Sequence, residues 1–213
     1  MLTIHHLGLS QSERIVWLAE EMGLEYEFRR YERRADNRMA PDEYKALHPM
    51  GIAPVITDGD LVLGESGAII DYMVATYPGG EALVPSPGNI DFADHLFWFH
   101  FANGTFMTNG MMQLMLMMAD AQNPMPGQFV ATRTEKAWDR VEQRLGEAKY
   151  FGGAMLSTAD IMMGYGLTTA RLTRGTSIEP YPNIRAYLQR IGERPAYSRA
   201  MAKAEPGMAP KLD

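Results

Sequence analysis

The chain of 213 residues contains no cysteine. This absence excludes disulfide bonds, thiolate nucleophiles and C-x-x-C redox motifs in one step. Any thiol chemistry that the protein performs must therefore use a thiol that the substrate brings. Metal chelation by the histidine pair is also excluded, because His5 and His6 point to opposite sides of an extended strand. We expect no metal site.

Other absences narrow the choice of partners and compartment. The net charge is −6 and no long basic patch is present, so we expect no nucleic-acid partner. Residues 1–9 lack the basic and apolar regions of a signal peptide. The apolar run 111–119 is too short to cross a bilayer and contains Gln113. We expect a cytoplasmic protein without a membrane partner.

The first half of the chain alternates strand and helix patterns. A hydrophobic content of 46% is enough for one large domain or two small ones. The first three elements form a βαβ unit with parallel strands, and a hairpin and a helix follow. The Asp58-Gly59 pair in the hairpin suits a type I′ turn. The expected elements are strand 2–7, helix 15–22 closed by Gly23, strand 26–30, helix 41–47, hairpin strands 55–57 and 61–63, and a helix from residue 66.

This order predicts a thioredoxin-like domain with a mixed four-stranded sheet over residues 1–77. Two proline–glycine clusters mark residues 78–88 as a linker. Beyond them the pattern is helical, so residues 89–213 are expected to form an all-helical bundle. We expect helices over residues 90–121, 129–148, 157–172, 183–191 and 195–204, a break at residues 123–127, and a surface tail from residue 205.

Four local patterns, in this order, resemble the cytosolic glutathione S-transferases over essentially the whole chain. The resemblance is closest to the bacterial, serine-type, theta-like members. The patterns are Ser10-Gln11-Ser12-Glu13-Arg14, Ala53-Pro54, Glu65-Ser66 and Ser157-Thr158-Ala159-Asp160. The last one resembles a buried capping box, in which Ser157 and Asp160 each satisfy the other's main-chain N–H. We expect this box to stabilise the fold and give it no catalytic role.

The resemblance implies that Ser10 is the catalytic residue. A hydroxyl there would donate a hydrogen bond to the sulfur of glutathione and favour the thiolate. Ser12 is the fallback, although either serine could simply cap the helix that follows. Arg14 is expected on the surface of the first helical turn.

The resemblance also implies the glutathione-binding residues. Ala53 and Pro54 match a cis-proline dipeptide, whose main chain would pair with the peptide-like ligand. Glu65 would meet the α-ammonium group, and Ser66 at a helix N-terminus would bind the α-carboxylate. Ile52 departs from the family pattern, because a basic residue often stands there. Arg38, His48 or a main-chain group would have to replace it.

A methionine-rich helix provides the candidate second-substrate pocket. Met side chains are flexible and suit promiscuous apolar sites, although core packing is the alternative for most of them. Positions 107, 111 and 115 share one helical face. The expected lining residues are Phe106, Met107, Met111, Met115 and Tyr165.

The sequence therefore predicts a glutathione transferase, a detoxification enzyme that conjugates the thiolate to small apolar electrophiles. Glutathione is the co-substrate, and the resemblance implies a homodimer. One alternative is another glutathione-dependent enzyme, namely an isomerase, a dehalogenase or a peroxidase. The other is a non-catalytic binding or scaffold protein of the same fold.

Overall fold

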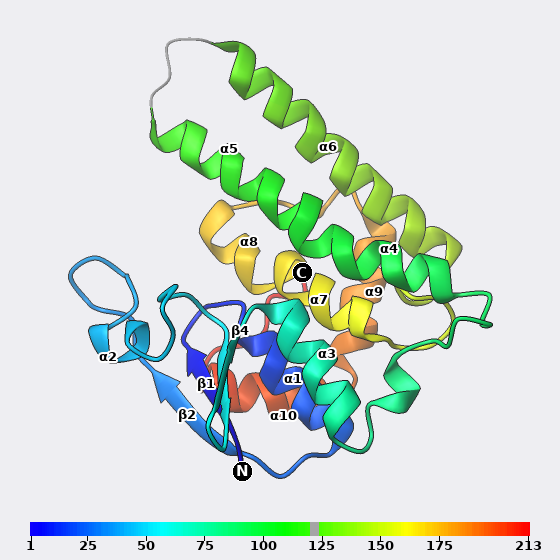
Figure 1. The fold of residues 1–213 in the computed structure, drawn as a ribbon. Coiled ribbons are helices and arrows are strands. Elements are labelled where there is room, and N and C mark those ends of the chain that lie inside the picture. The colour runs from blue at the N-terminus through cyan, green and yellow to red at the C-terminus, as the bar shows by residue number, and fades with distance from the viewer. Residues whose placement is uncertain (120–123) are drawn as a thin grey trace.

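A computed structural model describes residues 1–119 and 124–213 of the chain (Figure 1). Its sheet has four strands in the order β2-β1-β3-β4. Strand β1 pairs in parallel with β2, and the β1–β3 and β3–β4 pairs are antiparallel. The strands are β1 (Leu2–Leu7), β2 (Glu27–Tyr31), β3 (Val55–Asp58) and β4 (Leu61–Gly64). The predicted thioredoxin-like domain with a mixed sheet is confirmed.

Strand β1 is buried along its whole length, and its side chains alternate between two layers. Leu2 and Ile4 belong to the main hydrophobic core, whereas Leu7 packs in a smaller cluster that contains Tyr44. The two histidines follow the same alternation. His5 contacts the Tyr31 hydroxyl at 3.0 Å, and His6 stacks on the other side against the Phe28 ring. They therefore share no partner, as the strand pattern predicts.

Three helices cover the sheet. Helix α1 (Glu13–Met22) and helix α3 (Ser66–Thr76) lie on one side, and the short helix α2 (Asp42–Lys45) lies on the other (Figure 1). Gly23 ends α1 with φ 67°, the left-handed conformation expected of a helix-terminating glycine. Between β3 and β4, only Gly59 has positive φ. The predicted type I′ turn is therefore wrong, because that turn needs positive φ at both central residues.

The second half of the described chain is helical, which confirms the predicted helical domain. Helices α5 and α6 run side by side and extend beyond the rest of the molecule (Figure 1). A π-helical turn, η2, interrupts the long helix that enters this pair. The elements are η1 (Glu81–Leu83), α4 (Phe92–Phe101), η2 (Ala102–Met107), α5 (Thr108–Met118), α6 (Pro124–Glu147), α7 (Thr158–Leu167), α8 (Thr169–Arg174), α9 (Pro182–Gly192) and α10 (Pro195–Ala204).

Two helix predictions in this half are wrong. Helix α6 begins at Pro124, inside the predicted break 123–127, because proline is tolerated in a first turn where its missing N–H has no partner to lose. Part of that break, and the end of the helix predicted to reach residue 121, fall at residues 120–123, outside the described residues. The single helix predicted over 157–172 is divided at Thr168, whose ψ of −100° is not helical.

The predicted surface tail is also wrong, because residues 205–213 pack against the body of the protein. Glu205 is buried, and the Leu212 side chain lies against Gly192 of α9. Arg171 donates to the main-chain oxygens of Lys211 and Asp213. The two prolines that suggested an irregular tail do exclude a helix, but they do not prevent these contacts.

Helix α1 joins the two halves of the molecule. The Trp17 ring on α1 meets the Tyr197 ring of α10 edge to face, with 5.0 Å between centroids. A Cβ on Gly164 of α7 would lie 2.7 Å from the Trp17 ring, so only glycine allows this close approach. One continuous hydrophobic cluster consequently runs from the sheet into the helical half. Across the described ranges, no helix is both long and apolar enough to cross a membrane.

The capping box that begins α7 is confirmed. The Asp160 carboxylate is fully buried and accepts hydrogen bonds from the main-chain N–H of Ser157 and of Phe151, each at 2.9 Å. It also accepts one from the Tyr187 hydroxyl at 3.1 Å. One side chain therefore satisfies buried donors from three separate segments.

Replacing Asp160 by alanine should destabilise the protein by on the order of 3 kcal/mol, since it leaves several buried donors without partners. Chemical denaturation of both proteins measures this difference. The matched control is Asp36→Ala, because Asp36 is exposed and contacts only its own loop. Equal unfolding free energies for Asp160→Ala and Asp36→Ala would contradict the structural role.

Candidate functional site

The loop between β1 and α1 holds the two serines singled out by the sequence. Ser10 is 5% exposed, and Ser12 is completely buried. Their hydroxyl oxygens lie 2.7 Å apart, and the Ser12 main-chain N–H donates to Ser10 Oγ at 3.3 Å. Ser12 occupies the N-cap position of α1, but its side chain makes no capping hydrogen bond. The simple capping explanation therefore does not account for the Ser12 hydroxyl, whereas Ser10 Oγ accepts an N–H of the first turn as a capping residue does.

Behind the serines lies a polar chain that sequence reasoning missed. Ser12 Oγ is 2.9 Å from His6 Nδ1, and His6 Nε2 is 3.2 Å from a carboxylate oxygen of Glu205. The alternation along β1 places His6 on the side of α1, which is the available sequence signal for this residue. Glu205 gives no such signal, because it follows α10 and reaches the site only through tertiary packing.

Arg14 lies inside the protein, so its predicted surface position is wrong. Its side chain is 1% exposed, and its Nη1 donates to Gln11, Asn103 and Ser66 at 2.6, 2.9 and 3.2 Å. The guanidinium also lies 5.5 Å from the centre of the Tyr165 ring. Burial lowers the pKa of Arg14 to about 10, which still leaves it charged at neutral pH. Four segments thus meet at one cation.

This cation has no ion pair with any described residue, and its Nε and Nη2 atoms are buried without hydrogen-bond partners there. A buried positive charge is costly unless a negative charge lies close by. The Ser66 hydroxyl that it contacts begins α3, where unpaired main-chain N–H groups also favour an anion. The start of α3 is thus electrostatically prepared for a carboxylate.

Glu65 directly precedes this anion-favouring position. It is exposed and holds φ at 70°, a left-handed conformation that a non-glycine residue rarely adopts. Its carboxylate makes no hydrogen bond or ion pair with another described residue. An exposed carboxylate beside a prepared carboxylate site suits a ligand that carries both an ammonium and a carboxylate group.

The peptide bond between Ala53 and Pro54 is cis. The main chain of Ala53 makes no hydrogen bond to the described part of the protein, whereas Val55, two residues on, pairs with Gly64 in the sheet. Ile52 is 44% exposed and offers no charge. Of the two side chains that might replace a basic residue there, His48 lies against Gly64 at the end of this strand pair.

The five residues expected to line a second pocket are found in two environments. Phe106 and Met107 are buried, and the Phe106 ring packs 4.9 Å from that of Trp138 in the helical core. Met111 and Met115 are 49% and 48% exposed on α5. Tyr165 is half-buried and contacts the Arg14 cation. Only the last three residues therefore keep surface that a ligand can reach.

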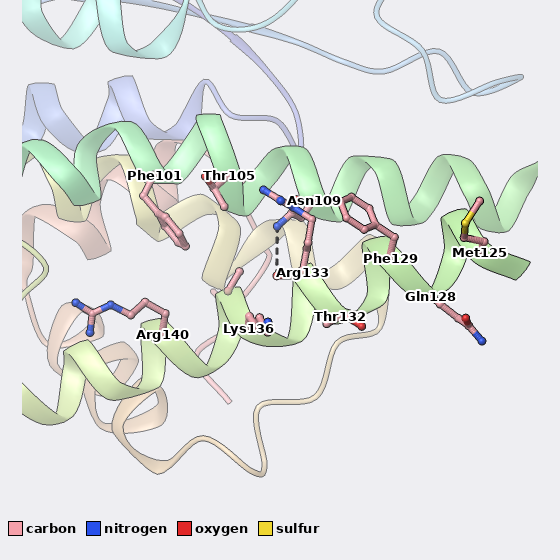
Figure 2. A pocket seen from close by; sticks show the side chains of 11 residues that line it. Phe101, Thr105, Asn109, Met125, Gln128, Phe129, Thr132, Arg133, Lys136 and Arg140 are labelled. Carbon is pink, nitrogen blue, oxygen red and sulfur yellow. Dashed lines mark hydrogen bonds between the residues drawn. The ribbon is translucent and has the colours of Figure 1, made fainter.

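A separate groove of about 670 Å³ lies between the α4–α5 segment and α6 (Figure 2). Phe101 and Phe129 line it, together with the basic side chains of Arg133, Lys136 and Arg140. Asn109 bridges the two sides by donating to the main-chain oxygen of Arg133. None of the serines, Arg14 or Ser66 reaches this groove, so its size does not identify it as the site of chemistry.

No group of three metal-ligating side chains occurs within residues 1–119 and 124–213.

Glu13, next to Arg14, is a buried acidic residue. It is 3% exposed and accepts a hydrogen bond from the Thr169 hydroxyl at 2.6 Å. Burial raises the pKa of Glu13 to about 7, and the nearby charge of Glu205 adds to this, although the Thr169 hydrogen bond opposes it.

Comparison with known proteins gives a consistent result. Residues 10–76 match the family model described as "Glutathione S-transferase, N-terminal domain", and residues 107–201 match "Glutathione S-transferase, C-terminal domain". Glutathione S-transferase 3 of Schizosaccharomyces pombe is 29% identical, with 96% of this chain and 88% of that protein covered. The crystal structure of a glutathione S-transferase from Actinobacillus pleuropneumoniae is 32% identical, has a TM-score of 0.88, and matches over 96% of this chain and 93% of its own.

The raised pKa of Glu13 predicts a pH-dependent stability. The native state keeps the proton up to about pH 7, whereas the unfolded state releases it near the ordinary value of 4.5. The stability that this proton contributes is thus complete below the unfolded-state pKa and is lost as the pH rises through 7. Glu13→Gln should reduce the loss of unfolding free energy between about pH 5 and about pH 8 by on the order of 2–3 kcal/mol. Urea denaturation across this range measures it, and the exposed Glu25→Gln serves as the control that keeps the wild-type pH dependence.

Proposed function

We propose that this chain, which belongs to the glutathione S-transferase family, is a glutathione transferase that conjugates the glutathione thiolate to apolar electrophiles. In this proposal Ser10 stabilises the thiolate, and the substrate supplies the nucleophile. No covalent enzyme intermediate is needed. The absence of cysteine agrees with this assignment, since thiol-transfer members of the family use a cysteine at the site.

The observation that carries the proposal is the buried Arg14 cation, which donates to Ser66 and forms no ion pair with any described residue. Glutathione ends in a γ-glutamyl group whose α-carboxylate would provide the missing negative charge. Ser66 would donate its hydroxyl and a helix N-terminal N–H to that carboxylate. Glu65, exposed beside it, would pair with the α-ammonium group. Family membership and this electrostatic demand thus support the same ligand.

The remaining parts of glutathione have matching partners. The free main chain of Ala53, next to Pro54, would pair with the cysteinyl backbone as a neighbouring strand does. His48 is our candidate for the glycyl carboxylate, in the place of the basic residue that Ile52 does not supply. The thiol would then lie at the Ser10 hydroxyl, close to the N-terminus of α1, whose partial positive charge favours a thiolate.

We assign the second substrate to the helical half. Residues 1–77 would bind glutathione, residues 78–88 would connect the halves, and residues 89–213 would supply the apolar pocket. The exposed Met111 and Met115 and the half-buried Tyr165 are its proposed lining, whereas Phe106 and Met107 would support it from within the core. Flexible thioether side chains suit small electrophiles of varied shape.

We also propose that the enzyme is a cytoplasmic homodimer that acts in detoxification, as the family resemblance implies. Phe97 on α4 is 48% exposed and stacks on Phe101, with 5.3 Å between ring centroids. An apolar, aromatic face of this kind is typical of a protein interface, and a second copy of the chain would cover it.

Ser10→Ala should lower the turnover of a reactive aryl halide about 10- to 100-fold, the effect of one lost hydrogen bond to a charged sulfur. Glutathione affinity should change little, because the other contacts remain. Calorimetry and initial-rate assays measure the two quantities, with the exposed Ser86→Ala as control. Unchanged turnover in Ser10→Ala would transfer the role to Ser12 or to the helix, and no binding of glutathione by the wild type would refute the proposed function.

Ser66→Ala should weaken glutathione binding about tenfold, because it removes a donor from a charged carboxylate. A glutathione analogue that lacks the α-carboxylate should bind the wild type and Ser66→Ala equally. Calorimetry with both ligands and both proteins forms a closed cycle that isolates this contact. A similar loss for both ligands would place the carboxylate elsewhere.

A further inference from the structure

Four polar side chains form an unbroken line from the proposed thiol position to the segment that follows α10. The successive distances are 2.7 Å from Ser10 Oγ to Ser12 Oγ, 2.9 Å from there to His6 Nδ1, and 3.2 Å from His6 Nε2 to Glu205. His6 and Ser12 are fully buried, and Ser10 and Glu205 are each 5% exposed. The middle of the line is therefore sealed from solvent, and only its two ends keep a small exposed surface.

The hydrogen-bonding capacity of the two hydroxyls limits how this line can be arranged. Ser12 Oγ already accepts the main-chain N–H of Leu7 at 3.1 Å, so it can accept one more hydrogen bond and donate one. Its only other contact, with the Leu7 oxygen at 3.4 Å, is longer than those with Ser10 and His6. If Ser12 donates its single proton to His6, the only hydrogen bond that Ser12 and Ser10 can then share is one that Ser10 donates and Ser12 accepts.

These limits produce two alternative directions of donation. In the first, Ser10 donates to Ser12 and Ser12 donates to a neutral His6, so Ser10 can only accept a hydrogen bond from a ligand. In the second, His6 Nδ1–H donates to Ser12 and Ser12 donates to Ser10. Only in the second direction is the Ser10 hydroxyl free to donate to sulfur. Stabilisation of a thiolate by Ser10 thus requires a proton on His6 Nδ1.

We propose that His6 is the base that receives the glutathione proton, through the hydroxyls of Ser12 and Ser10, and that Glu205 stabilises the resulting imidazolium. This inference rests on the proposed function, because it needs a thiol at Ser10. Ser10 touches the reacting sulfur and is catalytic. Ser12, His6 and Glu205 act through it and are positioning residues.

The proton balance of the step is closed. The thiol S–H bond breaks as its proton passes to Ser10 Oγ, the Ser10 proton passes to Ser12 Oγ, and the Ser12 proton passes to His6 Nδ1. The products are a thiolate that accepts from Ser10 and an imidazolium paired with the Glu205 carboxylate. No net charge leaves the protein. After conjugation the proton returns along the same hydroxyls to the displaced anion or to water, which restores the first direction.

The surroundings of Glu205 keep it ready for this role. Burial raises its pKa, but hydrogen bonds from His6 and the Leu9 main-chain N–H, together with Arg30, outweigh this and hold the pKa below its ordinary value. The carboxylate is therefore ionised when an imidazolium forms beside it. Two further charged groups act on Glu205: Arg30 on β2 contacts it at 3.3 Å, and the buried Glu13 on α1 is within electrostatic reach of it. The remaining face of the imidazole meets the uncharged Phe28 ring.

The decisive experiment is a comparison of His6→Gln with His5→Gln. Both histidines lie on β1 and are equally buried, at 0% and 3% exposure, but only His6 belongs to the line. The pKa of bound glutathione is measured from the ultraviolet absorbance of its thiolate as the pH varies. His6→Gln should raise this pKa by about one unit, which is roughly tenfold less thiolate at neutral pH. His5→Gln should leave it at the wild-type value.

S-methylglutathione, which has no ionisable thiol, separates this proposal from the proposed function. It should bind the wild type and His6→Gln equally, because the relay acts only on the thiol proton. Wild-type protein that binds neither ligand refutes the proposed function. Wild-type protein that binds glutathione, with an equal thiol pKa in His6→Gln, overturns the relay alone. Equal shifts of the thiol pKa in His5→Gln and His6→Gln would also overturn it. Such shifts would come from a general disturbance of β1 and not from the loss of the hydrogen-bonded line.

A measurement on the unmodified protein protects the test against a variant that does not fold. The chain has five histidines, and nitrogen NMR of histidine-labelled protein reports the protonation of each ring. Binding of glutathione should leave one histidine ring with a proton on each of its two nitrogens. Binding of S-methylglutathione should not produce this change. Glu205→Gln should abolish this signal while still accepting the Leu9 N–H. A set of histidine signals that responds identically to the two ligands would overturn the proposal.

Discussion

The guanidinium of Arg14 is the point at which the two halves of this molecule meet the candidate site. It is carried by α1, donates to the first residue of α3, and donates to Asn103 of the helical half. Holding a cation there without a carboxylate costs stability, and folding alone would favour an apolar residue of similar size. Because the surrounding core is continuous and closely packed, the protein tolerates this cost. The unfavourable free energy of burying this charge arises where an anionic ligand would compensate it. Natural proteins often keep such locally unfavourable features at functional sites.

The order of strands and helices could be predicted from the sequence because each element depends on its own local pattern. Alternation specified β2, the 3.6-residue period specified α1, and glycine specified the end of that helix. The capping box of Asp160 was equally local, since its two main residues are three positions apart. The errors at Gly59 and Thr168 concern single backbone torsions, which the apolar pattern of a segment does not specify.

The site could be predicted only in part, for a related physical reason. The family resemblance indicated Ser10, Pro54 and Ser66, because each stands in a motif of a few consecutive residues. It could not indicate that Arg14 is buried, because a charged residue in a first turn is most often exposed. Nor could it pair His6 with Glu205, which lies 199 positions away. Contacts of that range follow from packing of the whole chain, and no local pattern records them.

The large separation in sequence between His6 and Glu205 has a consequence for folding during synthesis. Strand β1 and the serine loop are synthesised well before Glu205, which lies 199 positions after His6. Until that later segment is made, His6 would have its serine partner but not its carboxylate. The thioredoxin-like half can therefore begin to fold early, while the line from Ser10 to Glu205 becomes complete only when the segment after α10 returns to β1.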